Sequence, residues 1–310
     1  MRSRRVKLKF LCLLFLSLVM LNGCSEDSSP VISQSPSPAA LTLSSPTRIA
    51  VAPSGQLVVS DYAAGNVLFF DSDTLQAVSK IRVSGKLTAV GATEDKVLIG
   101  FETSGAIGVY SYAGDFLYAL GAGIREFGRP SDLVVDPTGA LVYVADSGAK
   151  NVKIYNLLDG SYVDTWGQGQ MYFPTGIAFD HSDNTLLIAD FGAVKTGGGS
   201  MSFEPESYSA GIWRFDLNGN YVETITGAFS RPQGVAVNSS GEIFIVDSLL
   251  GEVLTLKETI VSAGYEIIDR YGAELPLELP LDVVLAEQDN KLFVTNNLAA
   301  QVVAIDVGGN

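Results

Sequence analysis

Few residues of this chain are equipped for chemistry. The 310 residues include one histidine, His181, and two cysteines, Cys12 and Cys24. A single histidine excludes a three-histidine zinc site and argues against a Ser-His-Asp triad. Beyond residue 24 there is no cysteine for a disulfide, a thiolate nucleophile or a cysteine-ligated metal. His181 stands in the polar segment 180–184, where we expect a solvated turn residue.

Two carboxylates remain as candidates for ligand chemistry. Asp132 and Asp282 occupy the same position in two copies of a phrase that recurs six times. Carboxylate oxygens are the ligands that Ca²⁺ prefers, so the pair is a candidate calcium site and Ca²⁺ the one candidate cofactor. Arg48 holds that position in another copy, and an ion pair between Arg48 and Asp282 is the alternative interpretation.

The recurring phrase defines the elements that would position these residues. Its clearest copies are Arg-Pro-Ser-Asp-Leu-Val-Val-Asp at 129–136, Phe-Pro-Thr-Gly-Ile-Ala-Phe-Asp at 173–180 and Arg-Pro-Gln-Gly-Val-Ala-Val-Asn at 231–238, and weaker copies begin at Pro46, Leu87 and Pro280. A period of about 40–50 residues is the signature of a repeat fold such as a propeller. A polar residue follows every copy after a second apolar run: Asp61, Glu102, Asp146, Asp190, Asp247 and Asn296. Acids this regular predict turn formers that bind nearby backbone N–H groups.

Each copy predicts four short strands. In the third copy, runs at 133–135, 141–145, 152–155 and 162–166 are separated by turns rich in Gly, Asn, Asp and Pro. No helical periodicity extends over ten residues beyond the N-terminal segment. One such sheet cannot bury both faces alone, whereas six packed radially can. We therefore predict an all-β, six-bladed β-propeller with four antiparallel strands in each blade.

The last copy ends before its fourth strand. Its strands are expected at 282–285, 291–295 and 301–306, which leaves four residues. The segment Ala-Leu-Thr-Leu-Ser at 40–44 has the pattern of a strand. We expect it to pair with 301–306, complete the last blade and remove an open sheet edge.

The phrases resemble the NHL repeat family of six-bladed propellers over residues 46–306. The second copy departs by lacking the Pro and Gly, and the sixth has Asp282 where Gly is usual. The resemblance implies a central channel lined by the start of each innermost strand, with Arg48, Asp132, Gln233 and Asp282 as candidate binding residues. The family includes binding modules, lyases and lactonases, so the fold does not decide the function. The E-G-P, N-G and P-D-G motifs of the calcium lactonases are absent from the matching strand starts.

The first 40 residues predict export. A basic start, an apolar run at 10–21 and Leu-Asn-Gly-Cys at 21–24 form a signal peptide at 1–23 that resembles a bacterial lipobox, with Cys24 as the lipidated residue. Residues 24–39 are rich in Ser and Pro and predict a tether, followed by the propeller at 40–310. Ser25 after the cysteine favours the outer membrane by resemblance to enteric sorting rules.

Charge narrows the choice of partners. The whole chain has a net charge of −14, and removal of residues 1–23 leaves 15 basic against 34 acidic residues, or −19. Such a chain repels nucleic acid and anionic lipid, so membrane contact is expected through the lipid anchor alone. Basic envelope proteins are the expected partners of a monomeric propeller.

The fourth copy has an insertion at 191–211. Its Met201, Phe203 and Tyr208 are candidate contacts of a lid or partner-binding loop on the face of the channel entrance. The preferred function is a lipid-anchored protein-binding or assembly module of the cell envelope, without catalytic residues. The alternatives are a metal-dependent hydrolase, lactonase or lyase, and a sensor that binds a small ligand in the channel.

Overall fold

A computed structural model of the chain describes residues 41–192, 210–227, 229–259, 264–273, 275–286, 288 and 290–307, and the backbone of 195–197 and 200–202. Cys24, Phe203 and Tyr208 lie outside this set. Residues 41–310 form one compact unit. Strands and turns build the part that is described, which has no α-helix, so no helix there is long and apolar enough to cross a membrane.

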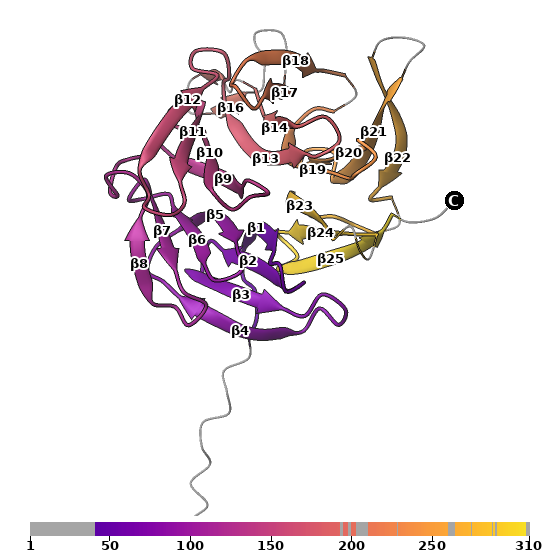
Figure 1. Ribbon diagram of the computed structural model, residues 1–310. Helices are drawn as coiled ribbons and strands as arrows, with labels where there is room; N and C mark the ends of the chain where they lie inside the picture. The colour runs from indigo at the N-terminus through magenta and orange to yellow at the C-terminus, as the bar shows by residue number, and fades with distance from the viewer. Residues whose placement is uncertain are drawn as a thin grey trace, which may run out of the picture. The chain divides into compact units, whose positions relative to one another are not determined.

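Six antiparallel sheets form the blades of a β-propeller, in chain order around the ring (Figure 1). The innermost strands are β1 (Pro46–Val51), β5 (Leu87–Ala92), β9 (Pro130–Val135), β13 (Pro174–Asp180), β19 (Pro232–Val237) and β23 (Pro280–Ala286). The second strands are β2 (Leu57–Asp61), β6 (Val97–Phe101), β10 (Leu141–Asp146), β14 (Thr185–Asp190), β20 (Ile243–Asp247) and β24 (Lys291–Asn296). The third strands are β3 (Asn66–Phe70), β7 (Ala106–Tyr110), β11 (Asn151–Asn156), β17 (Gly211–Asp216), β21 (Glu252–Thr259) and β25 (Gln301–Asp306). The fourth strands of the first five blades are β4 (Ala77–Arg82), β8 (Phe116–Ala119), β12 (Tyr162–Trp166), β18 (Tyr221–Ile225) and β22 (Gly264–Tyr271).

The strand order follows from where apolar residues fall. The second strands are mainly apolar, and β2, β14 and β20 are buried at every position, as expected for strands covered on both faces. The fourth strands carry polar residues, and β12 and β18 are exposed over their first residues. The predicted six-bladed, all-β propeller is confirmed.

The core lies between the blades. Six separate clusters of buried apolar side chains each join two neighbouring sheets, and the cluster around Leu57 and Phe293 joins the first blade to the last. Each innermost strand contacts the next around the ring, and β23 contacts β1. Asn297 strengthens this closure, because its side-chain amide donates to Ser45 Oγ and to the Pro46 carbonyl, both at 2.9 Å.

The prediction that residues 40–44 form a strand paired with 301–306 is wrong for the part that the structure describes, residues 41–44. The hydrogen-bonded sheet of the sixth blade has three strands, β23, β24 and β25. Leu41 and Leu43 pack on the same cluster as Val302 and Ala304 of β25, so the N-terminal segment covers this blade with its side chains. No ladder joins residues 41–44 to β25. The N–H groups of Ser44 and Ser45 instead bind the Asp61 carboxylate, at 2.6 and 3.1 Å.

The regular acids have the predicted turn role in four blades, and Asn296 repeats part of it in the sixth. Asp146 is fully buried and accepts hydrogen bonds from the N–H groups of Gly128, Arg129 and Ala149 at 2.8–3.0 Å. Asp61, Asp190 and Asp247 bind the equivalent N–H groups of their own blades. Each acid therefore fixes the chain just before an innermost strand. Glu102 is the exception, since its carboxylate accepts from the Tyr62 hydroxyl at 2.5 Å and pairs with Arg129 at 3.2 Å.

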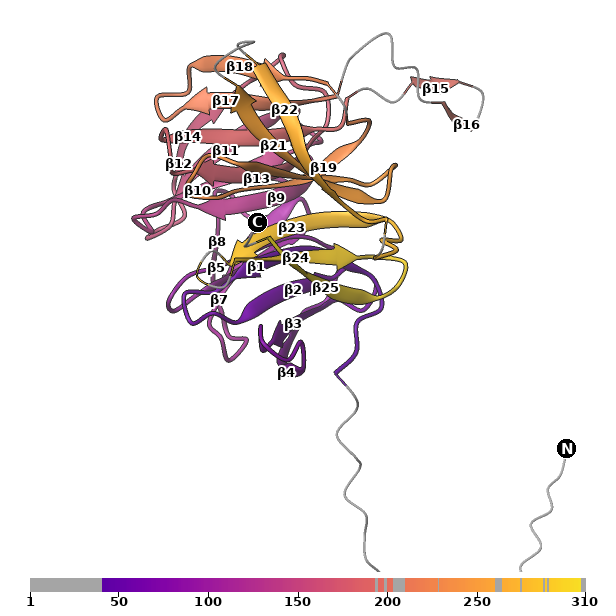
Figure 2. The same cartoon turned by 90° about the vertical axis from the view of Figure 1, so that its right-hand side faces the viewer.

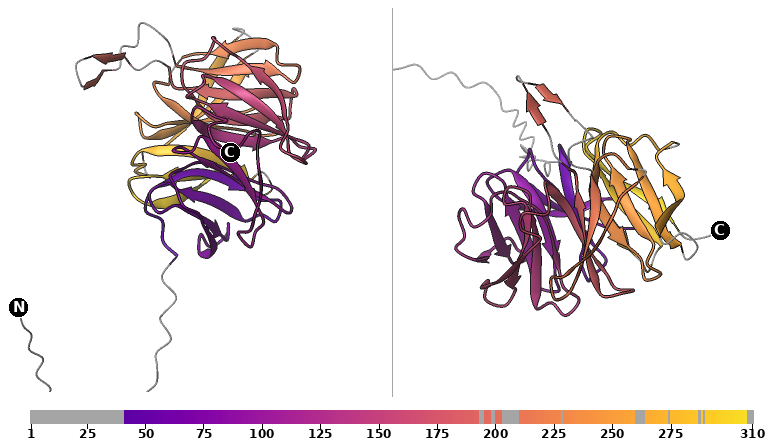
Figure 3. Two further views of the ribbon diagram at one scale, coloured as in Figure 1. Left: turned by 90° about the vertical axis from the view of Figure 1, so that its left-hand side faces the viewer. Right: turned by 90° about the horizontal axis from the view of Figure 1, so that it is seen from above.

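The insertion in the fourth blade contains a small hairpin. Strands β15 (Lys195–Gly197) and β16 (Ser200–Ser202) pair with each other, and Met201 stands opposite Thr196. The hairpin stands away from the six sheets in Figure 2 and in both views of Figure 3. The sequence predicted the insertion but not this hairpin.

Candidate functional site

A cavity of about 730 Å³ lies where the innermost strands begin. Every blade contributes to its wall, from Thr47 of the first to Leu281 of the last. Ligand pockets for small molecules fall in the range of about 300–1,000 Å³, so the cavity has the size of a binding site. Phe191 and Gly192 also line it, which puts the base of the blade-four insertion on this face, as expected.

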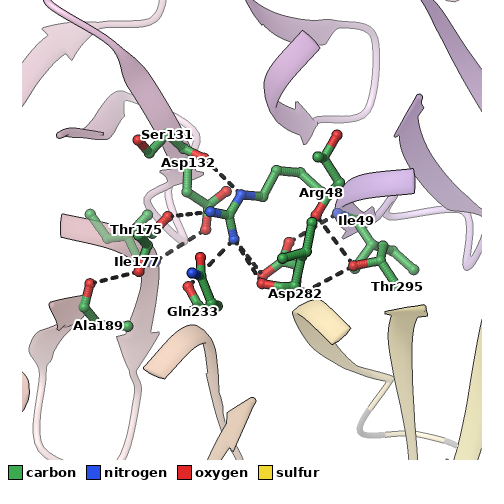
Figure 4. A network of polar contacts seen from close by, with 12 residues as sticks. Arg48, Ile49, Ser131, Asp132, Thr175, Ile177, Ala189, Gln233, Asp282 and Thr295 are labelled. Atoms are coloured by element: carbon green, nitrogen blue, oxygen red, sulfur yellow. Dashed lines mark hydrogen bonds and ion pairs between the residues drawn. The ribbon is translucent and has the colours of Figure 1, made fainter. Parts of the chain in front are cut away.

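Arg48 forms the floor of this cavity. Its side chain leaves β1 and donates Nε to the Ser131 carbonyl and Nη2 to the Thr175 carbonyl, both at 2.7 Å (Figure 4). Nη1 donates to the carbonyls of Leu281 at 3.2 Å and Gln233 at 3.5 Å. One guanidinium thus binds blades three, four, five and six, and the side chain is only 7% exposed. The planar fork of arginine, with five donors and a permanent charge, suits this role.

Asp282 and Asp132 lie beneath the guanidinium as clips between blades. Asp282 pairs with Arg48 at 3.4 Å and accepts from the Ile49 N–H at 3.0 Å. Asp132 accepts from the Ile177 N–H at 3.1 Å and from the Leu133 N–H at 2.9 Å. The predicted ion pair between Arg48 and Asp282 is therefore present. In the next blade, each aspartate accepts from the N–H of the residue that follows its own equivalent position, Ile49 for Asp282 and Ile177 for Asp132.

Burial shapes the protonation of these two acids. Loss of water raises the pKa of Asp132 well above its usual value, and the charge of Asp282 raises it further, while Arg48 opposes both effects. Burial likewise raises the pKa of Asp282, and Arg48 with the Ile49 N–H lowers it. The cluster holds one cation and two acids in a dry environment, which favours a proton on one carboxyl group.

The channel residues predicted from the sequence separate into two levels. Arg48 and Gln233 line the cavity, whereas Asp132 and Asp282 line a second cavity of about 360 Å³ on the other side of the guanidinium. His181 lines that second cavity and is exposed, with its ring stacked on Phe179 at 6.3 Å. Arg48 therefore divides the channel.

The two candidate calcium ligands, Asp132 and Asp282, form hydrogen bonds with the chain itself. In the described part of the chain, no group of three or more His, Cys, Asp or Glu side chains is placed to hold an ion. Asp132 and Asp282 bind backbone N–H groups, and the positive charge beside them is the Arg48 guanidinium. Their oxygens act as acceptors of the fold in this arrangement.

Three cations surround the mouth of the first cavity, and the sequence analysis did not single them out. Each lies over an aromatic ring that also lines the wall: Arg129 over Phe173 at 5.7 Å, Lys150 over Tyr172 at 5.6 Å and Arg231 over Phe191 at 4.2 Å. Arg129 and Arg231 precede the proline of their phrases, so the signal was present in the repeat itself. The turn acids place them, because Asp146 and Asp247 bind the N–H groups of these arginines at 2.8 and 3.2 Å.

Of the insertion residues predicted as partner contacts, the structure describes only the backbone of Met201. Met201 lies in β16, and Phe203 and Tyr208 fall outside the described residues, as does the lipidation candidate Cys24. Their roles remain predictions.

No protein-family model and no curated protein matches this chain. Solved structures, including the following two, are similar to this chain in fold. Hydrazine synthase of Kuenenia stuttgartiensis aligns over 89% of this chain and 99% of its own at 14% identity, with a TM-score of 0.63. A structural-genomics protein of unknown function from Bacteroides thetaiotaomicron aligns over 86% of this chain and 70% of its own, also at 14% identity and a TM-score of 0.63. At this identity the likeness shows the fold alone, and the NHL resemblance stays a prediction.

Proposed function

We propose that this chain is a lipid-anchored binding module of the bacterial cell envelope, and that the face around the 730 Å³ cavity is its recognition surface. The observation that supports this function is the cavity itself. Its wall is built by the innermost strands of all six blades and the loops beside them, and Arg48 closes its floor. A preorganised concave wall of this kind lowers the entropy lost on binding.

The chemistry of the wall favours binding over catalysis. Its described residues include hydroxyl, amide, aromatic and cationic side chains, with no carboxylate, imidazole or thiol among them. A hydrolase or lyase needs a general base or a metal, and the acids that the sequence offered lie below the Arg48 floor. The wall hydroxyls of Thr88 and Thr175 are hydrogen-bonded to backbone carbonyls of the next blade. They serve the ring rather than nucleophilic attack.

The anchoring is tested separately from the recognition. Metabolic labelling with a radioactive fatty acid is expected to label the parent protein and to leave Cys24→Ser unlabelled. An unlabelled parent in a bacterial host would remove the lipid anchor from the proposal.

Recognition is tested by capture from solubilised envelopes. We expect the parent to retain a partner that is lost when Lys150→Asn and Arg231→Gln are combined, because both side chains line the cavity. Asn suits position 150, whose φ of 60° lies in the left-handed region that Asn tolerates. The charge-matched control is Lys80→Gln with Arg82→Gln on β4, the outer strand of blade one. Equal capture by both double variants would show that the cavity face is not the recognition surface.

A further inference from the structure

The charged side chains of the cavity wall are positive, whereas the chain as a whole is negatively charged. The chain has a net charge of −14, yet the wall contains Arg48, Arg129, Lys150 and Arg231, and none of its described residues is acidic. Field lines concentrate in a concave site with low-dielectric walls, so a local cluster of one sign dominates the potential there. An acidic protein with a cationic pocket repels anions from most of its surface and accepts them at one place.

The three cationic side chains at the mouth of the cavity are each held over an aromatic ring. Arg129, Lys150 and Arg231 each lie over an aromatic ring, within 5.7 Å of its centroid. Stacking on a ring face leaves the edge of a guanidinium, with its N–H donors, directed away from the ring. Burial lowers the pKa of Arg231 and Asp247 opposes this effect, so the environment of this cation favours an added negative charge.

Arg48, at the floor of the cavity, has a different role from the three cations at the mouth. Arg48 donates to four backbone carbonyls and pairs with Asp282, so most of its donors are already used. The Gln233 side-chain amide lines the same cavity and makes no hydrogen bond to any other described side chain or backbone group. A bound molecule would therefore meet charge at the mouth, aromatic surface on the wall and one amide near the floor.

We propose that this cavity is a site for a small organic anion. Its carboxylate, sulfonate or phosphate oxygens bind Lys150 and Arg231, beside Arg129, which pairs with Glu102 at 3.2 Å, and its ring or hydrocarbon body lies against Tyr172 and Phe191. Arginine forks pair with such oxyanions through two parallel N–H···O bonds. The proposal rests on the cavity being the recognition surface of the binding module, and it specifies the chemistry that is recognised there.

Two probes that differ only in charge test the proposal on the purified protein. 1-Anilinonaphthalene-8-sulfonate is an aromatic anion, and N-phenyl-1-naphthylamine is the same molecule without the sulfonate. Both become fluorescent in an apolar site. We expect the anion to bind the parent about tenfold or more tightly than the neutral probe, which is the range of a hydrogen bond to a charged group. Equal affinity for the two probes would overturn the proposal.

Variants of the cavity wall and of a distant strand show where the two probes bind. Lys150→Asn combined with Arg231→Gln is expected to weaken the anionic probe about tenfold or more and to leave the neutral probe unchanged. Lys80→Gln combined with Arg82→Gln is expected to change neither affinity. Gln233→Trp fills the cavity without changing its charge, and loss of both probes is expected. If Gln233→Trp retains the anionic probe, that probe binds elsewhere and the proposal fails; circular dichroism confirms that each variant is folded.

Displacement of the sulfonate probe by small aromatic anions identifies the chemical class of the ligand. Benzoate and phenyl phosphate are expected to displace the sulfonate probe at lower concentrations than benzyl alcohol does, and the stronger of the two indicates a carboxylate or a phosphate ligand. If neither exceeds benzyl alcohol, the proposal fails. That failure is distinct from failure of the binding module, because neutral-probe binding that is sensitive to Gln233→Trp, together with partner capture on the cavity face, would still support the module.

Discussion

Replacing Arg48 by methionine tests whether one guanidinium holds the ring together. The variant keeps an unbranched apolar stem but removes the donors to the carbonyls of Ser131, Thr175, Gln233 and Leu281. It also leaves Asp282 without its cation, at a site where the carboxylate side chain is 4% exposed. Breaking a buried ion pair by removing one partner costs about 3–5 kcal/mol, and we expect a loss of stability in that range.

The measurement is urea unfolding followed by tryptophan fluorescence, at pH 7. The two tryptophans, Trp166 and Trp213, lie in β12 and β17 of blades three and four, two of the blades whose carbonyls Arg48 binds. Because domains are stable by only about 5–15 kcal/mol, the expected loss would move the unfolding midpoint clearly.

A second substitution separates charge from packing. If the loss comes from an uncompensated carboxylate, adding Asp282→Asn to Arg48→Met should recover about 1–4 kcal/mol of it, and the single Arg48→Met loss should be smaller at pH 4, where the carboxyl groups take up protons. A change below about 0.5 kcal/mol in Arg48→Met, the range of an ordinary surface substitution, would refute the reasoning. So would a double variant that is no more stable than Arg48→Met.

The remaining predictions concern protonation, turns and close contacts. Burial raises the pKa of Asp132 in the folded state, so the folded protein keeps the carboxyl proton at a pH where the unfolded chain has lost it. The stability that this neutral carboxyl group contributes is therefore complete below about pH 4. It falls as the pH rises through the folded-state pKa. Asp132→Asn should therefore flatten the decline in stability as the pH rises above about 4 in urea titrations, and an unchanged slope would contradict the raised pKa. Asp247→Ala leaves the N–H groups of Ser230, Arg231 and Leu249 without their acceptor, and we expect a loss of about 1–3 kcal/mol by thermal unfolding, together with weaker binding of the anionic probe as Arg231 shifts. Gly176→Ala would place a Cβ 2.5 Å from the Gln233 carbonyl oxygen, so a loss of about 1–3 kcal/mol is expected, whereas Gly139→Ala in an open turn with a φ of 71° should show only the smaller cost of that backbone conformation.

The strands were predictable because their signals are local. In the third blade, runs expected at 133–135, 141–145, 152–155 and 162–166 correspond to β9, β10, β11 and β12 within three residues at each end. Alternation of apolar residues and Gly, Asn or Asp in the turns determine such elements without reference to the rest of the chain. The repeat then supplied the number of blades.

The site was predictable only in part, because it depends on contacts between blades. The pairing of Arg48 with Asp282 followed from their equivalent positions in adjacent repeats. The reach of Arg48 to the carbonyl of Thr175, 127 residues away, did not, since backbone carbonyls are the same in every sequence. The stacked cations were also missed, because Arg129 and Arg231 stood inside a phrase that already had a structural explanation.

The third residue of the phrase, counted from its proline, governs how the channel is filled. Around the ring it is Arg48, Ala89, Asp132, Gly176, Gly234 and Asp282. A Cβ on Gly176 or Gly234 would lie 2.5–2.7 Å from the neighbouring strand, so these two blades approach through bare backbone. The small residues leave room for the one long side chain that crosses the ring, and Asp282 compensates its charge.

The residue before the proline of the phrase can vary in type, unlike the third residue, which is constrained by the channel. It is held in place by the N–H bond to the turn acid in the blades of Arg129, Phe173 and Arg231, yet its side chain faces the cavity. A backbone bond accepts any side chain, so this position can vary while the blade stays intact. The same acids that are too regular to be active sites thus fix the backbone from which the cavity presents its cations. In this propeller, the repeated residues build the ring, and the variable residue before the proline lines the cavity in the third, fourth and fifth blades.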